Sequence, residues 1–240
     1  MGKITREKFK TMHNVFDNHA DRVLFKLITE GHFEGLIGQI SMGKEANVFA
    51  AKKGKGKVVV KIYRLETCDY TRMYEHICND PRYMNVKRKR RLIVFAWCQR
   101  EFRNLMKARE AGMNVPLPIT FKDNVLVMEH IGKPDPAPKL KDHPPKDITS
   151  FYQATVKEMA LLHNSNLVHA DLSPFNILND KNKPVIIDMS QSTPLKTQGS
   201  KELFERDCKN MALFFSKHGL EKSTEELSRD VLGFLEKKKQ

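Results

Sequence analysis

The sequence predicts an α+β fold of two lobes, a β-rich first lobe and a helical second lobe. Short β-branched runs occur between residues 35 and 128, and amphipathic helical periods dominate after residue 148. Five of the eleven prolines lie between these regions, at 132–145. Because proline-rich segments commonly join lobes, we predict an N-terminal lobe over 1–131 and a C-terminal lobe over 132–240.

The first lobe is predicted to open on a helix, continue as strands and close on a second helix and a hairpin. A polar, irregular and flexible insertion separates its third strand from its long helix. The predicted elements are a helix over about 5–30, strands over 35–40, 48–51 and 57–63, a small-residue turn at 41–47, the insertion at about 65–91, a helix over 92–111 and a hairpin of strands 119–121 and 125–128.

The second lobe is predicted to consist of helices around one short pair of strands. Ser223 and Glu226 form a capping-box pattern that starts the last helix. The predicted elements are helices over 148–164 and 202–218, a loop over 167–176, strands over 176–178 and 185–187, and a helix after residue 223 that carries Val231, Phe234 and Leu235.

The chain is strongly basic, with 42 Lys and Arg against 29 Asp and Glu, a net charge of +13. Such an imbalance indicates a polyanionic partner such as RNA or a ribosomal particle. A generally basic surface without a specific partner is the alternative. Five of these cations are consecutive, and we name them the basic run: Lys87, Arg88, Lys89, Arg90 and Arg91.

The cysteine pattern predicts a reduced, cytoplasmic protein. Four cysteines lie far apart without a Cys-x-x-Cys pair, which argues against a zinc knuckle or a disulfide framework: Cys68, Cys78, Cys98 and Cys208. No run of 18 apolar residues occurs, so we expect no membrane partner.

Three polar residues of one loop suggest phosphoryl-transfer chemistry. His169 and Asp171 have the spacing His-x-Asp, and Asn176 follows five residues after the Asp. The spacing resembles the catalytic loop of protein kinases, in which the Asp orients the acceptor hydroxyl and the Asn binds Mg²⁺ on the phosphates. Taken alone, Asp and Asn in a loop are often only turn residues.

Asp188 extends this pattern. It ends the apolar strand 185–187, twelve residues after Asn176, where a kinase places its second metal ligand. Oxygen ligands from converging elements suit a hard cation. The alternative, a strand-end Asp that caps a turn, is less favoured because of the joint spacing.

Lys61 and a small-residue turn are candidates for binding phosphates. Lys61 lies inside an apolar strand, where a buried ammonium needs partners, and Glu101 on the following long helix is the candidate. The turn at 41–47 has Ser41, Gly43 and Lys44 in place to face phosphate oxygens. A solvent-facing edge-strand lysine and an ordinary hairpin turn are the alternatives.

Several segments together resemble the RIO family of atypical protein kinases, from about residue 30 to residue 219. The sequence Gly-Lys-Glu-Ala-Asn, at residues 43–47, resembles the signature of the Rio-one-type subgroup. With residues 1–34 before the first strand, we expect a compact form without long extensions. The segments are 41–48 (SMGKEANV), 69–71 (DYT), 80–83 (DPRY), 101–105 (EFRNL), 168–173 (VHADLS), 187–192 (IDMSQS) and 206–210 (RDCKN).

The resemblance implies a reduced two-lobe protein-kinase-like fold with an extra N-terminal helix. It implies an ATP-dependent serine/threonine kinase and ATPase that uses Mg²⁺, with Mn²⁺ as a substitute, and acts in maturation of the small ribosomal subunit. By the same resemblance, Lys61 binds phosphate with Glu101 as its partner, Glu129 and Ile131 lie where backbone groups hold adenine, Asp171 is catalytic, and Asn176 and Asp188 are metal ligands. The Asp at the position of Asp188 also becomes phosphorylated in the family.

The sequence departs from the family at Pro174-Phe175, where Glu-Tyr is usual, so the acceptor geometry is open. Only 52 residues follow Asp188, and helices that hold peptide substrates are not expected. Two other functions remain alternatives: a small-molecule phosphotransferase of kinase-like fold, and an RNA-binding assembly factor that senses nucleotide. The basic run is the expected contact with ribosomal RNA or the small-subunit precursor, against a plain solvated helix start.

Overall fold

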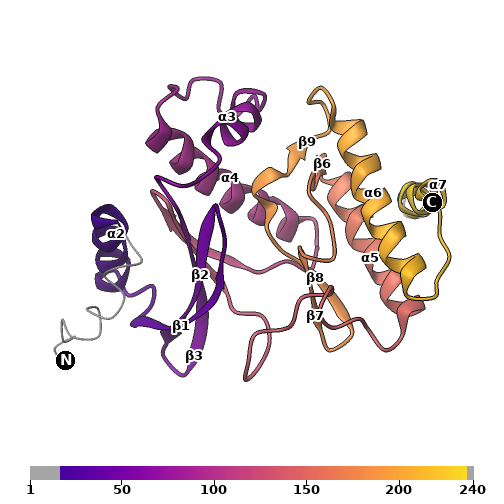
Figure 1. Ribbon diagram of the computed structural model, residues 1–240, viewed down its shortest axis with the longest axis horizontal. Coiled ribbons are helices and arrows are strands. Elements are labelled where there is room, and N and C mark those ends of the chain that lie inside the picture. Colours follow the sequence, from indigo (N-terminus) through magenta and orange to yellow (C-terminus); the bar gives the residue numbers. More distant parts are fainter. Residues whose placement is uncertain (1–16, 237–240) are drawn as a thin grey trace.

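The computed structural model describes residues 17–236 as a sheet-based lobe followed by a helical lobe (Figure 1). The sheet is antiparallel, in the order β1-β2-β3-β5-β4. Its strands are β1 (Gly35–Met42), β2 (Ala46–Lys53), β3 (Gly56–Tyr63), β4 (Pro118–Lys122) and β5 (Val125–Glu129). The five predicted strands are therefore present, and the turn at 41–47 is shorter than predicted because β1 and β2 both extend into it.

The two faces of β3 have different neighbours, because side chains alternate along a strand. Val58, Val60 and Ile62 share one apolar core with helix α2 (Asn18–Thr29), which lies beside the sheet in Figure 1. Lys61 and Tyr63 therefore lie on the opposite face, which is the face of the functional site. The predicted helix over 5–30 is observed over 18–29, and its first part lies outside the described residues.

The insertion is more regular than predicted. It contains helix α3 (Tyr70–Cys78), which packs against the long helix α4 (Arg90–Glu110). Met73 and Ile77 are each 1% exposed and join the same core as Trp97 of α4. These two residues are one helical turn apart among polar neighbours. A pattern of only two apolar positions is too short to predict a helix from the sequence.

The second lobe is built on three helices with short strand pairs at its inner edge (Figure 1). The 3₁₀ turn η1 and the pairing of β6 with β9 lie in segments predicted as irregular, because two-residue strands have no sequence period. The elements are α5 (Ile148–Asn164), β6 (Leu167–Val168), β7 (Ile177–Asp180), β8 (Lys183–Ile186), η1 (Met189–Gln191), β9 (Thr193–Pro194), α6 (Ser200–Lys217) and α7 (Thr224–Glu236).

The predicted capping box of α7 is confirmed. The backbone N–H of Ser223 donates to Glu226 Oε2 over 2.8 Å, and the backbone N–H of Glu226 donates to Ser223 Oγ over 3.1 Å. Each side chain satisfies a donor that the first turn of the helix leaves free.

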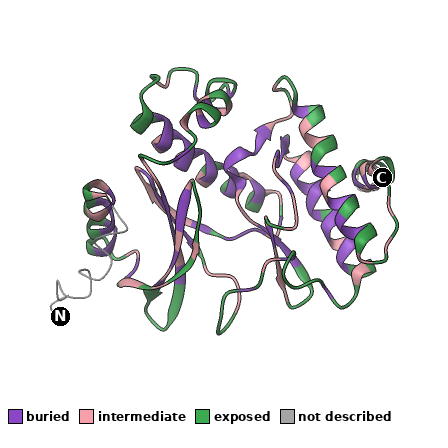
Figure 2. Cartoon of the chain, viewed as in Figure 1, coloured by how far each residue is buried: buried purple, intermediate pink, exposed green. Residues whose placement is uncertain are grey.

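Buried residues concentrate along α4 and α5 and on the inner strands, as Figure 2 shows. The proline-rich segment 132–145 leaves β5 and reaches the second lobe, where the Leu140 N–H donates to the Ile177 carbonyl over 2.8 Å. The division of the chain at residue 131 stays a prediction. Over residues 17–236, the helices are too short or too polar to cross a bilayer.

Candidate active site

Helix α6 holds the loop between β6 and β7 through hydrogen bonds to the loop backbone. The backbone N–H groups of Ala170 and Leu172 each donate to the Asp207 carboxylate over 2.8 Å. Asp207 is 2% exposed. Burial raises its pKa, although the two donated hydrogen bonds act in the opposite direction. His169 is also buried, and its Nε2 lies 3.1 Å from the Ile187 carbonyl. The loop therefore has a fixed shape that sets the direction of Asp171.

Asn176 and Asp171 are in direct contact. Asn176 Nδ2 donates to the Asp171 backbone carbonyl over 2.8 Å and to Asp171 Oδ2 over 3.2 Å. The carboxylate and carbonyl oxygens can only accept, so the amide must present its nitrogen to them. Asn176 Oδ1 takes no part in these two bonds and is left for a cation.

Asp188 is brought beside Asn176 by the end of β8. The Ile187 N–H donates to the Asn176 carbonyl over 3.0 Å, and Asp188 then adopts a left-handed backbone with φ 59°. Its carboxylate accepts from Lys61 Nζ over 2.9 Å and from Ser190 Oγ over 2.8 Å. Burial raises the pKa of Asp188, but Lys61 and Ser190 outweigh this effect and lower it to about 2. The group is therefore an anion at neutral pH.

Lys61 joins the two lobes. Its Nζ donates to Glu101 Oε1 of α4 over 2.9 Å and to Asp188 over the same distance. Lys61 is 7% exposed and Glu101 is 1% exposed. Burial alone lowers the pKa of a lysine, but the two carboxylates outweigh burial and raise the pKa of Lys61 above its usual value. Tyr63 holds the other oxygen of Glu101 through its hydroxyl.

Helix α4 also contacts the loop that carries Asp188. Asn104 Nδ2 donates to the carbonyls of Met189 and Ser192, each over 2.9 Å. Arg100 Nη2 donates to Thr193 Oγ1 over 2.7 Å. Helix α4, which supplies Glu101, is thus hydrogen-bonded both to Lys61 of β3 and to the segment 189–193 that follows Asp188.

One cavity of about 810 Å³ collects nearly all the predicted binding residues. Asp171 does not line it, but contacts it through Asn176. Gly43 forms the tight turn over the cavity, where a Cβ would lie 3.2 Å from the Ala46 carbonyl. The predicted residues that line the cavity are Ser41, Gly43, Lys44, Lys61, Glu101, Glu129, Ile131, Asn176 and Asp188.

The sequence reasoning missed other residues of the site. Glu45 lines the cavity, and burial together with Asp188 raises its pKa. Tyr63 and Ser190 hold carboxylates, and Gln191 contacts Asp171. The segments 41–48 and 187–192 contain three of these four residues, so the signal was present. The direction of each side chain was not readable from the motif.

The donor set fits a magnesium ion bound with phosphates. Asn176 Oδ1 and the Asp188 carboxylate are hard oxygen donors on converging elements. Across residues 17–236, no group of three His, Cys, Asp or Glu side chains could hold a metal by itself. Mg²⁺ commonly takes one or two protein oxygens and completes its shell with water and phosphate, which matches this arrangement.

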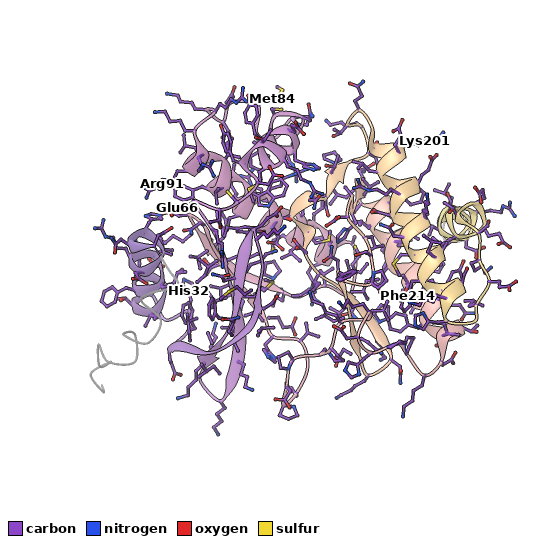
Figure 3. The ribbon with its side chains drawn as sticks, viewed as in Figure 1. His32, Glu66, Met84, Arg91, Lys201 and Phe214 are labelled. Carbon is purple, nitrogen blue, oxygen red and sulfur yellow. The ribbon has the colours of Figure 1, made fainter. Side chains whose placement is uncertain are left out.

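The basic run lies outside the cavity, at the start of α4, and all five side chains are exposed. Arg88, Arg90 and Arg91 lie over the rings of Tyr74, Tyr70 and Phe95 at 4.6, 5.3 and 5.3 Å. Arg91 is labelled in Figure 3, on the side of α4 that faces α2. The sequence did not predict that aromatic rings lie under these cations.

Comparison with known proteins identifies the family of the chain. Residues 47–227 match the model of the RIO domain. Proteins named RIO-type serine/threonine-protein kinase Rio1 from Haloferax volcanii and Methanocaldococcus jannaschii are 37% and 39% identical, each over 95% of this chain and 79% of the relative.

A solved structure shares the fold. The Rio2 kinase from Chaetomium thermophilum, crystallised as an ADP/Mg²⁺-phosphoaspartate complex, superposes with a TM-score of 0.66 at 19% identity. The match covers 86% of this chain and 64% of the Rio2 chain. The predicted two-lobe fold and the family resemblance are confirmed, and the chain belongs to the RIO family of atypical serine/threonine protein kinases, in its Rio1 subgroup.

Proposed function

We propose that this protein transfers the γ-phosphoryl group of ATP, with Mg²⁺, as a serine/threonine kinase and ATPase of small-ribosomal-subunit maturation. The observation that carries the proposal is the cluster of Lys61, Glu101 and Asp188 at 2.9 Å contacts inside one cavity. A buried ammonium between two carboxylates is a preformed phosphate and metal site.

Each predicted residue that lines the cavity has a role in this proposal. Lys61, held by Glu101, binds phosphate oxygens. Ser41, Gly43 and Lys44 cover the phosphates from the turn between β1 and β2. Backbone groups of Glu129 and Ile131 hold adenine at the end of β5, which suits the apolar wall that Met128 and Leu178 add to the cavity.

The metal ligands are Asn176, through Oδ1, and Asp188. A Mg²⁺ ion held by these two residues would neutralise the negative charge that builds up on the transferred group. Mn²⁺ substitutes for Mg²⁺ because the same hard oxygen donors accept both ions. Asp171 accepts the proton of the attacking hydroxyl or water, with one carboxylate oxygen held by Asn176.

The reaction proceeds in part through Asp188 itself. A carboxylate oxygen of Asp188 attacks the γ-phosphorus, the bond from that phosphorus to the β-phosphate oxygen breaks, and ADP leaves. Water then hydrolyses the acyl phosphate and releases phosphate. The low pKa of Asp188, about 2, keeps the carboxylate ionised for this attack. The phosphoaspartate of the Rio2 kinase from Chaetomium thermophilum supports the same chemistry in this fold.

The test is the chemistry of the label left on the protein after incubation with γ-labelled ATP and Mg²⁺. We expect an acid-stable phosphate that hydroxylamine and base remove, and Asp188→Asn should abolish it. Asp180→Asn, at the end of β7 and outside the cavity lining, is the matched control and should label normally. Label found only as hydroxylamine-resistant phosphoserine would show that Asp188 is a metal ligand alone.

The partner proposed for the basic run is the phosphate backbone of ribosomal RNA in the small-subunit precursor. Its exposed cations and the net charge of +13 support a polyanion. We also propose a cytoplasmic location, supported by four unpaired cysteines, three of them buried.

A further inference from the structure

The insertion helix α3 reaches the catalytic loop through one side chain. Arg72 Nη2 donates to Gln191 Oε1 over 2.9 Å, and Gln191 Nε2 donates to Asp171 Oδ2 over 3.0 Å. Gln191 is 6% exposed, whereas Arg72 is exposed on the surface of α3. A continuous chain of two hydrogen bonds therefore joins the surface of the insertion to Asp171.

The chemistry of the three groups fixes the direction of this chain. A guanidinium only donates and a carboxylate only accepts, so the Gln191 amide must present its oxygen to Arg72 and its nitrogen to Asp171. Arg72 thus does more than hold Gln191: it removes the flipped amide orientation, in which an oxygen would face the Asp171 carboxylate. Polarisation of the amide by the guanidinium also strengthens the second bond.

The hydrogen bonds to Asp171 determine which of its carboxylate oxygens can face the phosphoryl acceptor. Oδ2 accepts from both Gln191 and Asn176, so its lone pairs are engaged and the carboxylate cannot rotate freely. Oδ1 takes no part in these two bonds. We propose that Arg72 and Gln191 are positioning residues that hold Asp171 with Oδ1 toward the phosphoryl acceptor, so that phosphoryl transfer depends on docking of α3. The inference rests on the proposed role of Asp171.

A second set of contacts holds the same two segments together. Asp80, just after α3, is 1% exposed and accepts from Arg82 and from Arg100 of α4. Arg100 continues to Thr193, two residues after Gln191. Loss of Arg72 should therefore leave the insertion docked and remove only its effect on Gln191. This separation makes a positioning role distinguishable from a structural one.

The test is steady-state ATP turnover by the full chain with Mg²⁺, measured for Arg72→Ala, Gln191→Ala and the double variant. We expect each single variant to lose about tenfold in kcat, the range found for groups that orient a reacting residue. KM for ATP should stay within about twofold because neither residue lines the cavity. The double variant should lose no more than Gln191→Ala, since Arg72 acts through Gln191.

A conservative variant supplies a readout that loss of structure would not move. Gln191→Glu keeps an acceptor for Arg72 but replaces the N–H donor to Asp171 by a carboxylate oxygen, which cannot donate. It should therefore lose kcat as Gln191→Ala does, although it keeps the contact with α3, and KM for ATP should again stay within about twofold.

Arg103→Ala is the matched control, because Arg103 contacts the insertion through the Tyr83 ring at 5.6 Å and lies outside the chain of bonds. It should keep kcat within about twofold. Additive losses in the double variant, a KM that rises in step with the loss, or a Gln191→Glu variant with unchanged kcat would overturn the inference. Asp171→Asn separates the two levels: unchanged turnover would overturn the role of Asp171 and this inference together. Lowered turnover with an unaffected Gln191→Ala would overturn this inference alone.

Discussion

Lys61 shows how a charged residue is kept inside an apolar strand. The residue is 7% exposed, and its ammonium has a carboxylate at 2.9 Å on each side. The pKa of Asp188 is lowered to about 2 and that of Lys61 is raised. Their contribution to stability is therefore present from roughly pH 4 to pH 10, and is lost as pH falls toward 2 or rises through the raised pKa of Lys61.

Lys61→Ala should lower ATP turnover by about 100-fold or more, because a preorganised cation facing the phosphates is lost. The fold should persist, since Glu101 can take up a proton when its partner is removed, and Tm should fall by less than about 8 °C. Turnover and thermal unfolding check this together. Lys57→Ala is the control: Lys57 is on the same strand but donates to the Pro134 carbonyl. An unchanged rate in Lys61→Ala with a normal Tm would remove Lys61 from the site.

Spacing along the chain was enough to predict that Asp171, Asn176 and Asp188 lie together. Asn176 follows Asp171 in one loop, and a backbone hydrogen bond from Ile187 to Asn176 brings Asp188 beside them. Gln191 and Tyr63 could not be selected in the same way. Their roles depend on where side chains from α3 and α4 arrive, and those arrivals are set by packing between distant segments.

At the scale of the element, α3 is held by a histidine that is costly to charge. His76 lies edge-on to the Trp97 ring, with centroids 5.6 Å apart. Burial, and then the cations Arg100, Arg72 and Arg206, lower the pKa of His76 to about 4. The unfolded chain therefore binds more protons than the folded chain between about pH 4 and pH 6.5, and stability falls as pH falls through this window.

His76→Phe should flatten that dependence, because it keeps an aromatic ring on Trp97 and removes the titration. Between pH 7 and pH 4.5 the unmodified protein should lose roughly 1–2 kcal/mol more free energy of unfolding than the variant, after allowance for the partial exposure of the ring. Urea unfolding at the two pH values measures this difference. Equal losses in both proteins would mean that other groups control the acid side.

The helices and strands differed in how well the sequence predicted them. Helix α5 was predicted with its observed bounds, and α7 was announced by its capping box, since both signals are local. Helix α3 was missed because only two of its nine residues, Met73 and Ile77, are buried, which is too few for a clear period. The short strands β6 and β9 depend on a partner that arrives 25 residues later.

For the whole molecule, the distribution of charge matters more than the total. The basic run lies at the start of α4, and none of its residues lines the cavity, so binding of a polyanion need not compete with ATP. Three of its cations lie on aromatic rings, which restricts the orientations of their side chains. Composition predicted the polyanion, but not the rings that arrange the cations.

Replacing Lys87, Arg88 and Lys89 by Gln should weaken binding to a ribosomal RNA fragment and lower the slope of log K against log salt by about 2. The matched control replaces Lys52, Lys53 and Lys55 on the β2–β3 hairpin, which are exposed, and leaves the same net charge, 13 − 3 = +10. The control slope should change by less than about 1. Equal slopes for both variants would mean that binding follows total charge rather than this surface.

The bonds of α4 have a consequence for regulation. Within four residues this helix holds Lys61 through Glu101, the loop after Asp188 through Asn104, and Thr193 through Arg100. Swinging the helix outward would leave several buried polar groups unsatisfied, at roughly 1–3 kcal/mol each. Reversible disengagement of α4 is therefore a poor switch for this protein. Control is expected to act instead on the contact of α3 with the catalytic loop, on what enters the cavity and on how long the products stay in it.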